Sequence, residues 1–390
     1  MTLSKTFAPI LLLILQLAFF PANADDNEIT TPPPPTIAAS AYLLQDYHTG
    51  KILAENNADT KLAPASLTKI MTVYVVFREI SNGHLHLDDL ANISQKAWKT
   101  SGSRMFVEVN KPVKIEDLLK GVIIQSGNDA SVALAEHVAG SEETFAEMMN
   151  QHAARLGMTN SHFKNSDGLP MEDHYTTARD LATLTSALIR EFPDYYAWFS
   201  QKEFTYNKIT QHNRNQLLAR DESVDGVKTG FTDDAGYCLV TSALREGMRL
   251  ISVVMGAQSA NARANENQNL LNYGFRFFES HRLYQGKTAL SEAKVWKGND
   301  QTVPLGLAAD LFVTIPRRHY NDLKAEINID KKITAPINEG EKQGSVSVTL
   351  KNEPLLVRDL IALKSVEPGN IARRLYDGVL MMMEKSDDGK

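Results

Sequence analysis

The sequence predicts an α/β (α+β) domain in which helices are inserted into an antiparallel sheet, followed by a small all-β sandwich domain and a C-terminal amphipathic helix. Strand-like runs occur at residues 41–54 and again at 227–257, and the segment between them has a helical period. After about residue 280 the pattern changes to short alternating segments separated by Pro, Gly and Asn. At 390 residues, the chain is long enough for more than one domain.

The first 24 residues have the features of a secretory signal peptide. Lys5 is the only charged residue before position 25, residues 9–20 form a dense apolar run, and Ala-Asn-Ala at 22–24 fits a cleavage site. An uncleaved membrane anchor is the alternative, but the run is short for a transmembrane helix. We therefore expect export to the periplasm. Residues 25–37 contain four consecutive prolines and are expected to form a linker.

The predicted catalytic domain spans residues 38–280 and opens with a hairpin whose turn lies at Asp46–Gly50. A helix is expected over residues 66–80, because Pro64 precedes a long apolar run and proline favours helix starts. The later elements are a helical region, three antiparallel strands and a last helix, at 115–190, 227–232, 236–244, 250–257 and 263–279. Because strands come from both ends of the domain, we expect one sheet with the helices beside it.

Residues 281–367 predict a β-rich C-terminal domain. Apolar residues alternate at Leu311, Val313 and Ile315 and in later segments, as in half-buried strands. No set of catalytic residues is evident in this region, so a scaffold or spacer is the expected role.

Residues 368–390 predict an amphipathic helix. Its apolar residues fall on one face: Ile371, Leu375, Val379, Met382 and Met383. Contact with a membrane surface through residues 370–385 is one role for this face, and core packing or self-association is the other. The charges of the segment cancel, so its attraction to anionic lipid is expected to be weak.

Three short motifs occur in a fixed order: S-x-x-K at Ser66–Lys69, S-x-N at Ser126–Asn128, and K-T-G at Lys228–Gly230. Each motif alone is weak, and S-x-x-K also occurs at Ser161 and Ser291. The ordered set is specific, because it is the signature of enzymes that form an acyl-serine with penicillins and with peptides ending in D-alanine.

The chemistry explains these residue types. A serine hydroxyl is a poor nucleophile and needs an adjacent base. On a helix, residues three apart share a face, so Lys69 can reach the hydroxyl of Ser66. The start of a helix also favours developing negative charge. Lys69 acts as a base only when neutral, and burial together with the nearby charge of Lys228 would lower its pKa.

With these motifs and this layout, the chain resembles the low-molecular-mass penicillin-binding proteins. More narrowly, it is similar to periplasmic serine-type D-alanyl-D-alanine carboxypeptidases with a C-terminal β-domain, which implies the penicillin-recognising acyl-serine transferase fold. The resemblance covers nearly everything after the prolines. It extends to five further segments: Ala63–Ser66, Gln125–Ala130, Thr177–Asp180, Asn213–Asn215 and Tyr273–Phe278.

The resemblance implies roles for four catalytic residues. Ser66 would attack the carbonyl of the penultimate D-alanine and expel the terminal one, and Lys69 would take the hydroxyl proton. Ser126 would pass a proton to the departing amine, and Asn128 would orient the lysine and hold the peptide. The implied substrates are peptidoglycan stem peptides, with β-lactam antibiotics as covalent inhibitors.

The substrate-binding residues implied by the resemblance are Arg214, Lys228, Thr229, Gly230 and Phe231. The lysine, threonine and arginine would meet the terminal carboxylate, and the backbone N–H groups of Ser66 and Phe231 would form an oxyanion hole. Position 231 is a histidine in some relatives, and the C-terminal segment lacks the aromatic residues common in the family.

Three rival functions share parts of this pattern. A D,D-endopeptidase acting on peptidoglycan cross-links would use the same serine. A class A β-lactamase would carry a deacylating glutamate in an E-x-x-x-N stretch, but residues 160–177 offer only Glu172, four residues before Thr176. A non-catalytic wall-binding scaffold is disfavoured because all motif residues are present.

Composition argues against several other classes of protein. A net charge of −6 argues against nucleic acid as a partner. The ten histidines form no H-E-x-x-H or comparable pair, so neither a metal nor another cofactor is expected. Cys238 is the single cysteine, which rules out an internal disulfide, and its apolar surroundings predict a buried, inert thiol.

Overall fold

The computed structural model of the protein describes residues 31–387, with side chains described as far as residue 383. The predicted signal peptide and the first part of the predicted linker lie outside the described residues.

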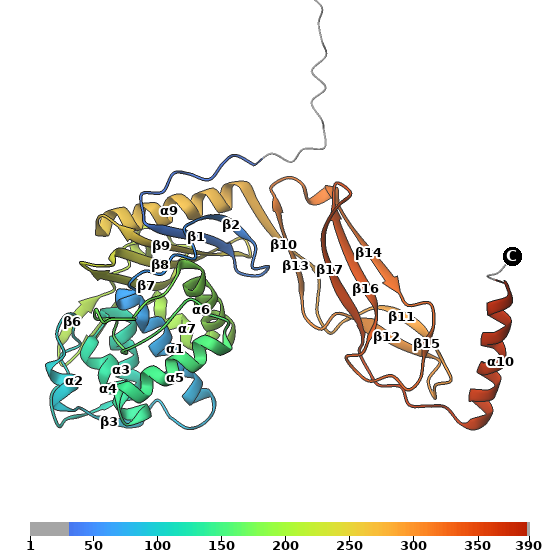
Figure 1. Cartoon of the computed structure of the whole chain (residues 1–390), viewed down its shortest axis with the longest axis horizontal. Helices are drawn as coiled ribbons and strands as arrows, with labels where there is room; N and C mark the ends of the chain where they lie inside the picture. Colours follow the sequence, from blue (N-terminus) through green and yellow to red (C-terminus); the bar gives the residue numbers. More distant parts are fainter. Residues whose placement is uncertain (1–30, 388–390) are drawn as a thin grey trace, which may run out of the picture. The chain divides into compact units, whose positions relative to one another are not determined.

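The first domain is built on a five-stranded sheet with the order β2-β1-β9-β8-β7, in which every neighbouring pair is antiparallel. Its strands are β1 (Ala41–Asp46), β2 (Ile52–Asn56), β7 (Val224–Thr232), β8 (Gly236–Arg245) and β9 (Met248–Ala257). The early hairpin therefore pairs with the late strands, through β1 and β9 (Figure 1). This confirms the prediction of one sheet built from both ends of the domain.

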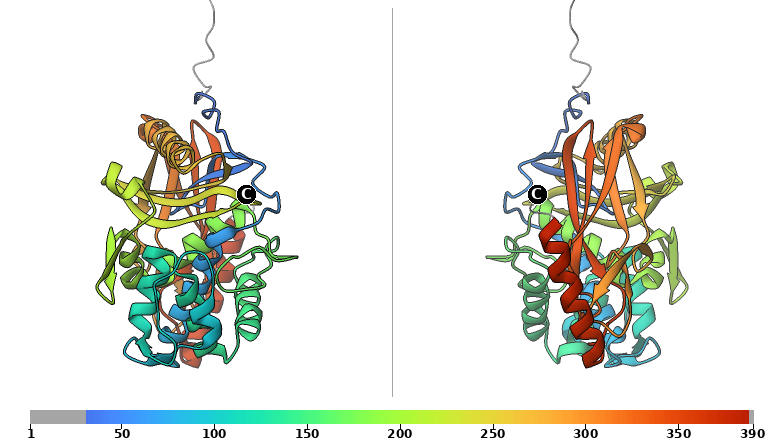
Figure 2. Two further views of the ribbon diagram at one scale, coloured as in Figure 1. Left: turned by 90° about the vertical axis from the view of Figure 1, so that its left-hand side faces the viewer. Right: turned by 90° about the vertical axis from the view of Figure 1, so that its right-hand side faces the viewer.

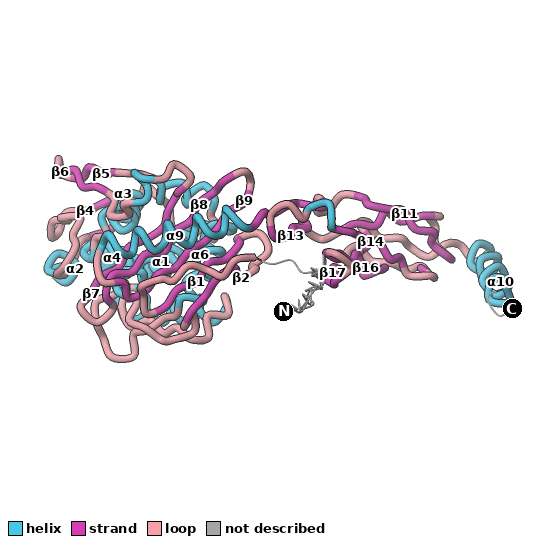
Figure 3. The backbone as a smooth tube through the Cα atoms, turned by 90° about the horizontal axis from the view of Figure 1, so that it is seen from above, coloured by secondary structure: helices cyan, strands magenta, loops and turns pink. Residues whose placement is uncertain are grey.

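Both faces of the sheet are covered, which explains the nearly continuous apolar runs in β8 and β9. In β9, Ile251 and Val253 join the core under the helical insertion, whereas Leu250 and Val254 join the core under α9 (Ala260–Phe277). Figure 2 and Figure 3 show α9 lying along one face of this sheet. The predicted helix began at residue 263, but α9 begins earlier because the hydroxyl of Ser259 caps it by accepting the N–H of Ala262.

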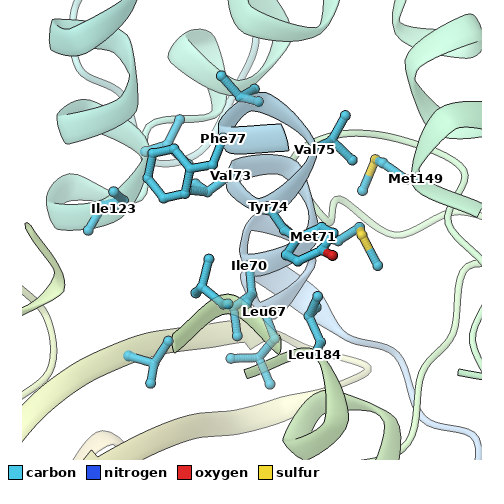
Figure 4. Packing of buried hydrophobic residues seen from close by; sticks show 14 of the residues in the cluster. Leu67, Ile70, Met71, Val73, Tyr74, Val75, Phe77, Ile123, Met149 and Leu184 are labelled. Carbon is cyan, nitrogen blue, oxygen red and sulfur yellow. The ribbon is translucent and has the colours of Figure 1, made fainter. Parts of the chain in front are cut away.

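The helical insertion surrounds α1 (Thr68–Ser81), whose residues Thr68–Phe77 are all buried. Figure 4 shows the α1 side chains pointing in several directions, with Phe77 and Val73 toward Ile123 and Val75 toward Met149. An all-round apolar helix of this kind is stable only inside a core. The other elements of the insertion are β3 (Leu90–Asn92), α2 (Gln95–Lys99), β4 (Pro112–Lys114), α3 (Ile115–Lys120), α4 (Asn128–Ala139), α5 (Glu142–Arg155), α6 (Ala178–Glu191), α7 (Pro193–Tyr196), β5 (Glu203–Tyr206), β6 (Ile209–His212) and α8 (Leu217–Arg220).

The second domain is made of β-sheet, as predicted. A six-stranded sheet has the order β14-β16-β17-β12-β11-β15, and β10 pairs with β13 in a separate two-stranded sheet. The strands are β10 (Phe278–Tyr284), β11 (Ala289–Trp296), β12 (Thr302–Gly306), β13 (Leu311–Pro316), β14 (Leu323–Ile329), β15 (Ile333–Thr334), β16 (Lys342–Leu350) and β17 (Glu353–Ala362). Along β13, Leu311, Val313 and Ile315 are buried, in agreement with the expected alternation.

The predicted C-terminal helix is present as α10 (Ile371–Asp387). Its carboxylate Asp377 is only 3% exposed and accepts the backbone N–H of Lys297 at 2.6 Å, which attaches this side of the helix to the β-domain. The apolar residues point the other way and remain 58–77% exposed: Ile371, Leu375, Val379, Met382 and Met383. The alternative of core packing for this face is therefore wrong within the described chain. Between residues 31 and 387, no helix is both long and apolar enough to cross a membrane.

Candidate active site

The three motifs meet at a pocket of about 430 Å³ between the sheet and the helical insertion. Ser66 stands just before α1, Ser126 and Asn128 stand at the start of α4, and Lys228–Gly230 belong to β7, the edge strand of the sheet. Fifteen residues line the pocket: Ser66, Gly102, Ser103, Ser126, Asn128, Asp167, Gly168, Leu169, Arg214, Thr229, Gly230, Phe231, Thr232, Tyr237 and Arg263. Seven of the nine predicted site residues are among them, and Lys69 and Lys228 lie buried directly behind the two motif serines.

Ser66 belongs to a 3₁₀ turn, Ala65–Leu67, rather than to the first turn of the helix as expected. The turn is crowded by neighbouring backbone on two sides. A Cβ on Gly168, whose φ is +83°, would lie 1.8 Å from the carbonyl oxygen of Ala65, and a Cβ on Gly230 would lie 3.2 Å from the Ala65 Cβ. Both glycines are therefore needed for their chains to approach the Ser66 turn, Ala65–Leu67, this closely.

Lys69 is fully buried and its amine contacts three oxygens. Nζ lies 3.0 Å from Ser66 Oγ, 2.7 Å from Asn128 Oδ1 and 2.5 Å from the backbone carbonyl of Asp167. The amide of Asn128 is oriented by its other end, since Nδ2 donates to the carbonyl of Ser101 at 2.7 Å. Asn128 thus presents an acceptor, and only an acceptor, to the lysine.

The second buried lysine, Lys228, is hydrogen-bonded to the second motif serine, Ser126. Lys228 Nζ donates to Ser126 Oγ at 2.8 Å and to the carbonyl of Thr229 at 3.0 Å. Ser126 has a left-handed backbone conformation, with φ of +63°, in the turn that joins a π-helical turn over Gly121–Gln125 to α4. This turn aims the hydroxyl of Ser126 into the pocket.

Burial, with a smaller contribution from the guanidinium of Arg214, lowers the pKa of Lys69 to about 8. The carboxylates of Asp167, Asp129 and Glu142 oppose these effects. Burial also holds the pKa of Lys228 well below its ordinary value, and the positive charges of Lys69, Arg214 and Arg263 act in the same direction. A lysine with a lowered pKa in a cleft is the expected form of a general base.

Three of the predicted substrate-binding residues, Arg214, Thr229 and Phe231, line the pocket beside Gly230. Thr229 is 5% exposed in β7, and Phe231 is 48% exposed and packs against Tyr237 with ring centroids 4.3 Å apart. Arg214 is exposed between two anchored asparagines: Asn213 donates to the carbonyl of Gln201, and Asn215 donates to that of Gly226.

Sequence reasoning missed part of the pocket wall. Gly102 and Ser103 come from the loop before β4, and Asp167, Gly168 and Leu169 come from the turn before α6. These segments contain no catalytic side-chain pattern, and Asp167 contributes its backbone carbonyl to the lysine. The glycines themselves are the one signal in the sequence, because glycines in turn-rich segments can adopt positive φ, as Gly102 and Gly168 do in the structure.

The competing candidates lie elsewhere. Ser161 bonds Asp180, Ser291 is on β11, and Glu172 is exposed and outside the pocket lining. Cys238 is buried in β8, and burial raises the pKa of its thiol to about 11, as expected for an inert cysteine.

Comparisons with known proteins agree with this geometry. A sequence profile described as D-alanyl-D-alanine carboxypeptidase (peptidase S11) matches residues 27–259, and a profile of the C-terminal domain of penicillin-binding protein 5 matches residues 278–368. The chain is 44% identical to D-alanyl-D-alanine carboxypeptidase DacC of Escherichia coli K12 over 359 residues, covering 90% of each chain. It is 41% identical to DacA of the same organism over 372 residues, covering 93% of this chain and 92% of that one.

Solved structures give the same result. A crystal structure of penicillin binding protein 5 from Haemophilus influenzae superposes with a TM-score of 0.82 at 40% identity, covering 86% of this chain and all of that one. Penicillin-binding protein D2 from Listeria monocytogenes, solved in an ampicillin-bound form, superposes with a TM-score of 0.58 at 31% identity, covering 62% of this chain and all of that one. The chain therefore belongs to the D-alanyl-D-alanine carboxypeptidase family of serine peptidases, with a penicillin-binding protein 5-type C-terminal domain.

Proposed function

We propose that this chain removes the terminal D-alanine from peptidoglycan pentapeptide stems through an acyl intermediate on Ser66. The observation that carries the proposal is the 3.0 Å contact between a buried lysine amine and the hydroxyl of a pocket serine, Lys69 and Ser66. A nucleophile with a base at hydrogen-bond distance is the arrangement that acyl transfer requires.

The contacts of Lys69 support its role as the base. A neutral amine has two N–H bonds and one lone pair. Asn128 Oδ1 and the carbonyl of Asp167 accept the two N–H bonds, so the lone pair faces Ser66 Oγ. Lys69 then takes the hydroxyl proton as Ser66 attacks the penultimate D-alanine carbonyl. The backbone N–H groups of Ser66 and Phe231 would hold the oxyanion.

The second half of the site would serve the leaving group. Ser126 Oγ, hydrogen-bonded to Lys228, passes its proton to the amine of the departing D-alanine as the C–N bond breaks. Thr229 and Arg214, which both line the pocket, would bind the terminal carboxylate of the substrate. Water then hydrolyses the ester, which restores the hydroxyl of Ser66 and releases the shortened peptide.

The same serine would be acylated by β-lactam antibiotics. The fifteen pocket-lining residues include no glutamate, and deacylation by a class A β-lactamase requires one. We therefore expect the penicilloyl-enzyme to hydrolyse slowly. Rapid turnover of penicillin in a stopped-flow experiment would contradict this part of the proposal.

The function is tested by measuring free D-alanine released from a pentapeptide ending in D-Ala-D-Ala. Wild-type protein should release it and the Ser66→Ala variant should not. If Ser66 is labelled by a fluorescent penicillin but no D-alanine is released, cross-linked muropeptides should be offered instead, because cleavage there would identify a D,D-endopeptidase. Failure of both labelling and release would leave a wall-binding scaffold.

We also propose the domain division predicted from the sequence: a signal peptide over residues 1–24, a linker over 25–37, the catalytic domain over 38–280 and a β-rich spacer over 281–367. In this arrangement the protein acts in the periplasm. The spacer would hold the catalytic domain away from the C-terminal helix, residues 368–390.

We propose that α10 attaches the protein peripherally to the inner membrane through residues 370–385. Support comes from its apolar face, where Leu375, Val379 and Met382 are 67%, 58% and 77% exposed, while Asp377 on the other side bonds the β-domain. Tyr376, 62% exposed, would lie at the headgroup level. Liposome flotation should recover the wild-type protein, with or without anionic lipid, and should lose the double variant Leu375→Glu/Met382→Glu. Equal flotation of both would refute the attachment.

A further inference from the structure

The position of the Lys69 amine depends on a turn that belongs to neither its own helix nor the three motifs. The shortest contact of Lys69 Nζ is to the carbonyl of Asp167, at 2.5 Å. Asp167 lies in the turn Asn165–Gly168, where Gly168 N–H donates to Asn165 Oδ1 at 2.7 Å. The interactions that hold this turn in place therefore also determine the position of the Lys69 amine.

Two side chains hold the turn from opposite sides at Ser166, which is fully buried. Thr72 Oγ1, from α1, donates to the carbonyl of Ser166 at 2.6 Å. Glu142 Oε1, from the first turn of α5, accepts both the backbone N–H of Ser166 at 3.0 Å and its hydroxyl at 2.8 Å. One carboxylate oxygen thus satisfies two buried donors in the residue next to Asp167.

Glu142 is held in place at its other oxygen. Oε2 lies 3.0 Å from Lys96 Nζ, and the Glu142 side chain is only 11% exposed. The adjacent Glu143 contacts the same lysine at 3.3 Å, but its side chain is 77% exposed and it is Glu142 that bonds Ser166. Both glutamates therefore contact Lys96, but Glu142 is the one that also bonds Ser166.

We propose that Glu142 is a positioning residue for the acylation reaction, which acts through Ser166 and the Asp167 carbonyl to hold Lys69 against Ser66. This inference rests on the proposed role of Lys69 as the base. A shift of about 1 Å in a catalytic group costs on the order of 100-fold in rate. Loss of the Glu142 carboxylate should therefore slow acylation although Glu142 touches neither the substrate nor Lys69.

The charge of Glu142 also acts on the base. It raises the pKa of Lys69 against the lowering effect of burial. The other charged groups that act on Lys69 come from α4, the Asp167 turn, the segment before α8 and β7: Asp129, Asp167, Arg214 and Lys228. The charged or titratable groups around Glu142 are Lys96, Glu143, Asp167, His174 and Lys69. Removal of the Glu142 charge alone should leave Lys69 neutral at lower pH.

The test is the second-order rate constant for acylation of the full chain by a fluorescent penicillin, measured across pH for three variants. Glu142→Ala removes the acceptor and should slow acylation by about ten- to 100-fold at the pH optimum. Glu142→Gln keeps an oxygen for Ser166, so it should acylate faster than Glu142→Ala, with its acid limb moved to lower pH. Glu143→Gln should match wild type in rate and in pH profile.

The outcomes separate this inference from the proposed function. Failure of the wild type to be labelled at Ser66 would remove the function itself. Labelling of the wild type, with Glu142→Ala within twofold of Glu143→Gln, would overturn the positioning role alone. An unmoved acid limb in Glu142→Gln would contradict the effect of the Glu142 charge on Lys69. If Glu142→Ala does not fold, Ser166→Ala supplies the second variant, since it removes one of the two donors and should slow acylation less than tenfold but measurably.

Discussion

The carboxylate of Asp129 holds the loop that forms one wall of the pocket, and its replacement by asparagine gives a sharp prediction. Oδ1 accepts the N–H of Met105 at 2.8 Å and that of Ala130 at 2.9 Å. Oδ2 accepts the N–H groups of Phe106 and Val107 at 2.8 and 3.2 Å. Asp129 is 1% exposed, so these bonds are made away from water.

The Asp129→Asn variant keeps one oxygen and turns the other position into a donor. With the oxygen toward Met105, the new NH₂ group faces the N–H groups of Phe106 and Val107, which are then left without an acceptor. An unsatisfied buried donor costs about 1–3 kcal/mol, and a bond to a charged acceptor contributes about 1.5–3 kcal/mol. The loop can relax partly toward water at Phe106, so we expect a loss of about 2–4 kcal/mol in the free energy of unfolding.

Urea denaturation measures the loss, and hydrogen exchange at residues 105–107 locates it. Acylation by penicillin should fall about tenfold, because Gly102 and Ser103 of the same loop line the pocket. Asp173→Asn is the matched control, since Asp173 is an exposed loop carboxylate with φ of +61°, which asparagine tolerates. If both variants unfold at the same urea concentration and exchange at 105–107 is unchanged, the carboxylate does not hold the loop.

Three further predictions concern the nucleophile and its surroundings. Acylation of Ser66 should rise with pH through about 8, because the pKa of Lys69 lies there and only the neutral amine accepts a proton; a pH-independent rate would exclude Lys69 as the base. Gly168→Ala should reduce penicillin labelling at least tenfold, since its Cβ would lie 1.8 Å from the Ala65 carbonyl and must displace the nucleophile turn; normal labelling would show that the turn tolerates the shift. Cys238 should react with a thiol reagent only after unfolding, and fast reaction of the native protein would contradict its burial.

The sequence was informative wherever a side-chain pattern carries the structure. Strands β8 and β9 could be predicted because both of their faces are buried and their residues are apolar without interruption. The three motifs could be recognised in the sequence because the roles proposed for their serine, lysine and asparagine residues depend on side chains. The sequence places the start of α9 too late because its first turn contains no large apolar residue, and the signal for the true start is the capping residue Ser259.

The turn at Asn165–Gly168 could not be predicted as part of the site for a different reason. Its contact with Lys69 is made by a backbone carbonyl, which every residue has, and its supports come from α1 and α5. Such contacts depend on tertiary packing of distant segments and leave no local pattern. The glycine at position 168 is the one sign of this contact in the sequence, because only glycine lets the turn approach the Ala65 carbonyl, with a φ of +83°.

The two buried lysines differ in the charges that surround them. Three carboxylates, those of Asp167, Asp129 and Glu142, favour the charged form of Lys69, whereas only positive groups act on Lys228. In the free enzyme the three carboxylates favour the protonated form of Lys69, in which it cannot act as a base. A substrate carboxylate bound by Thr229 and Arg214 would add negative charge beside Lys228 and would offset the positive charge of Arg214, which lowers the pKa of both lysines. Recognition of the carboxylate would therefore favour the charged form of both lysines, and burial of Lys69, the largest cause of its lowered pKa, is what leaves its amine free to act as a base.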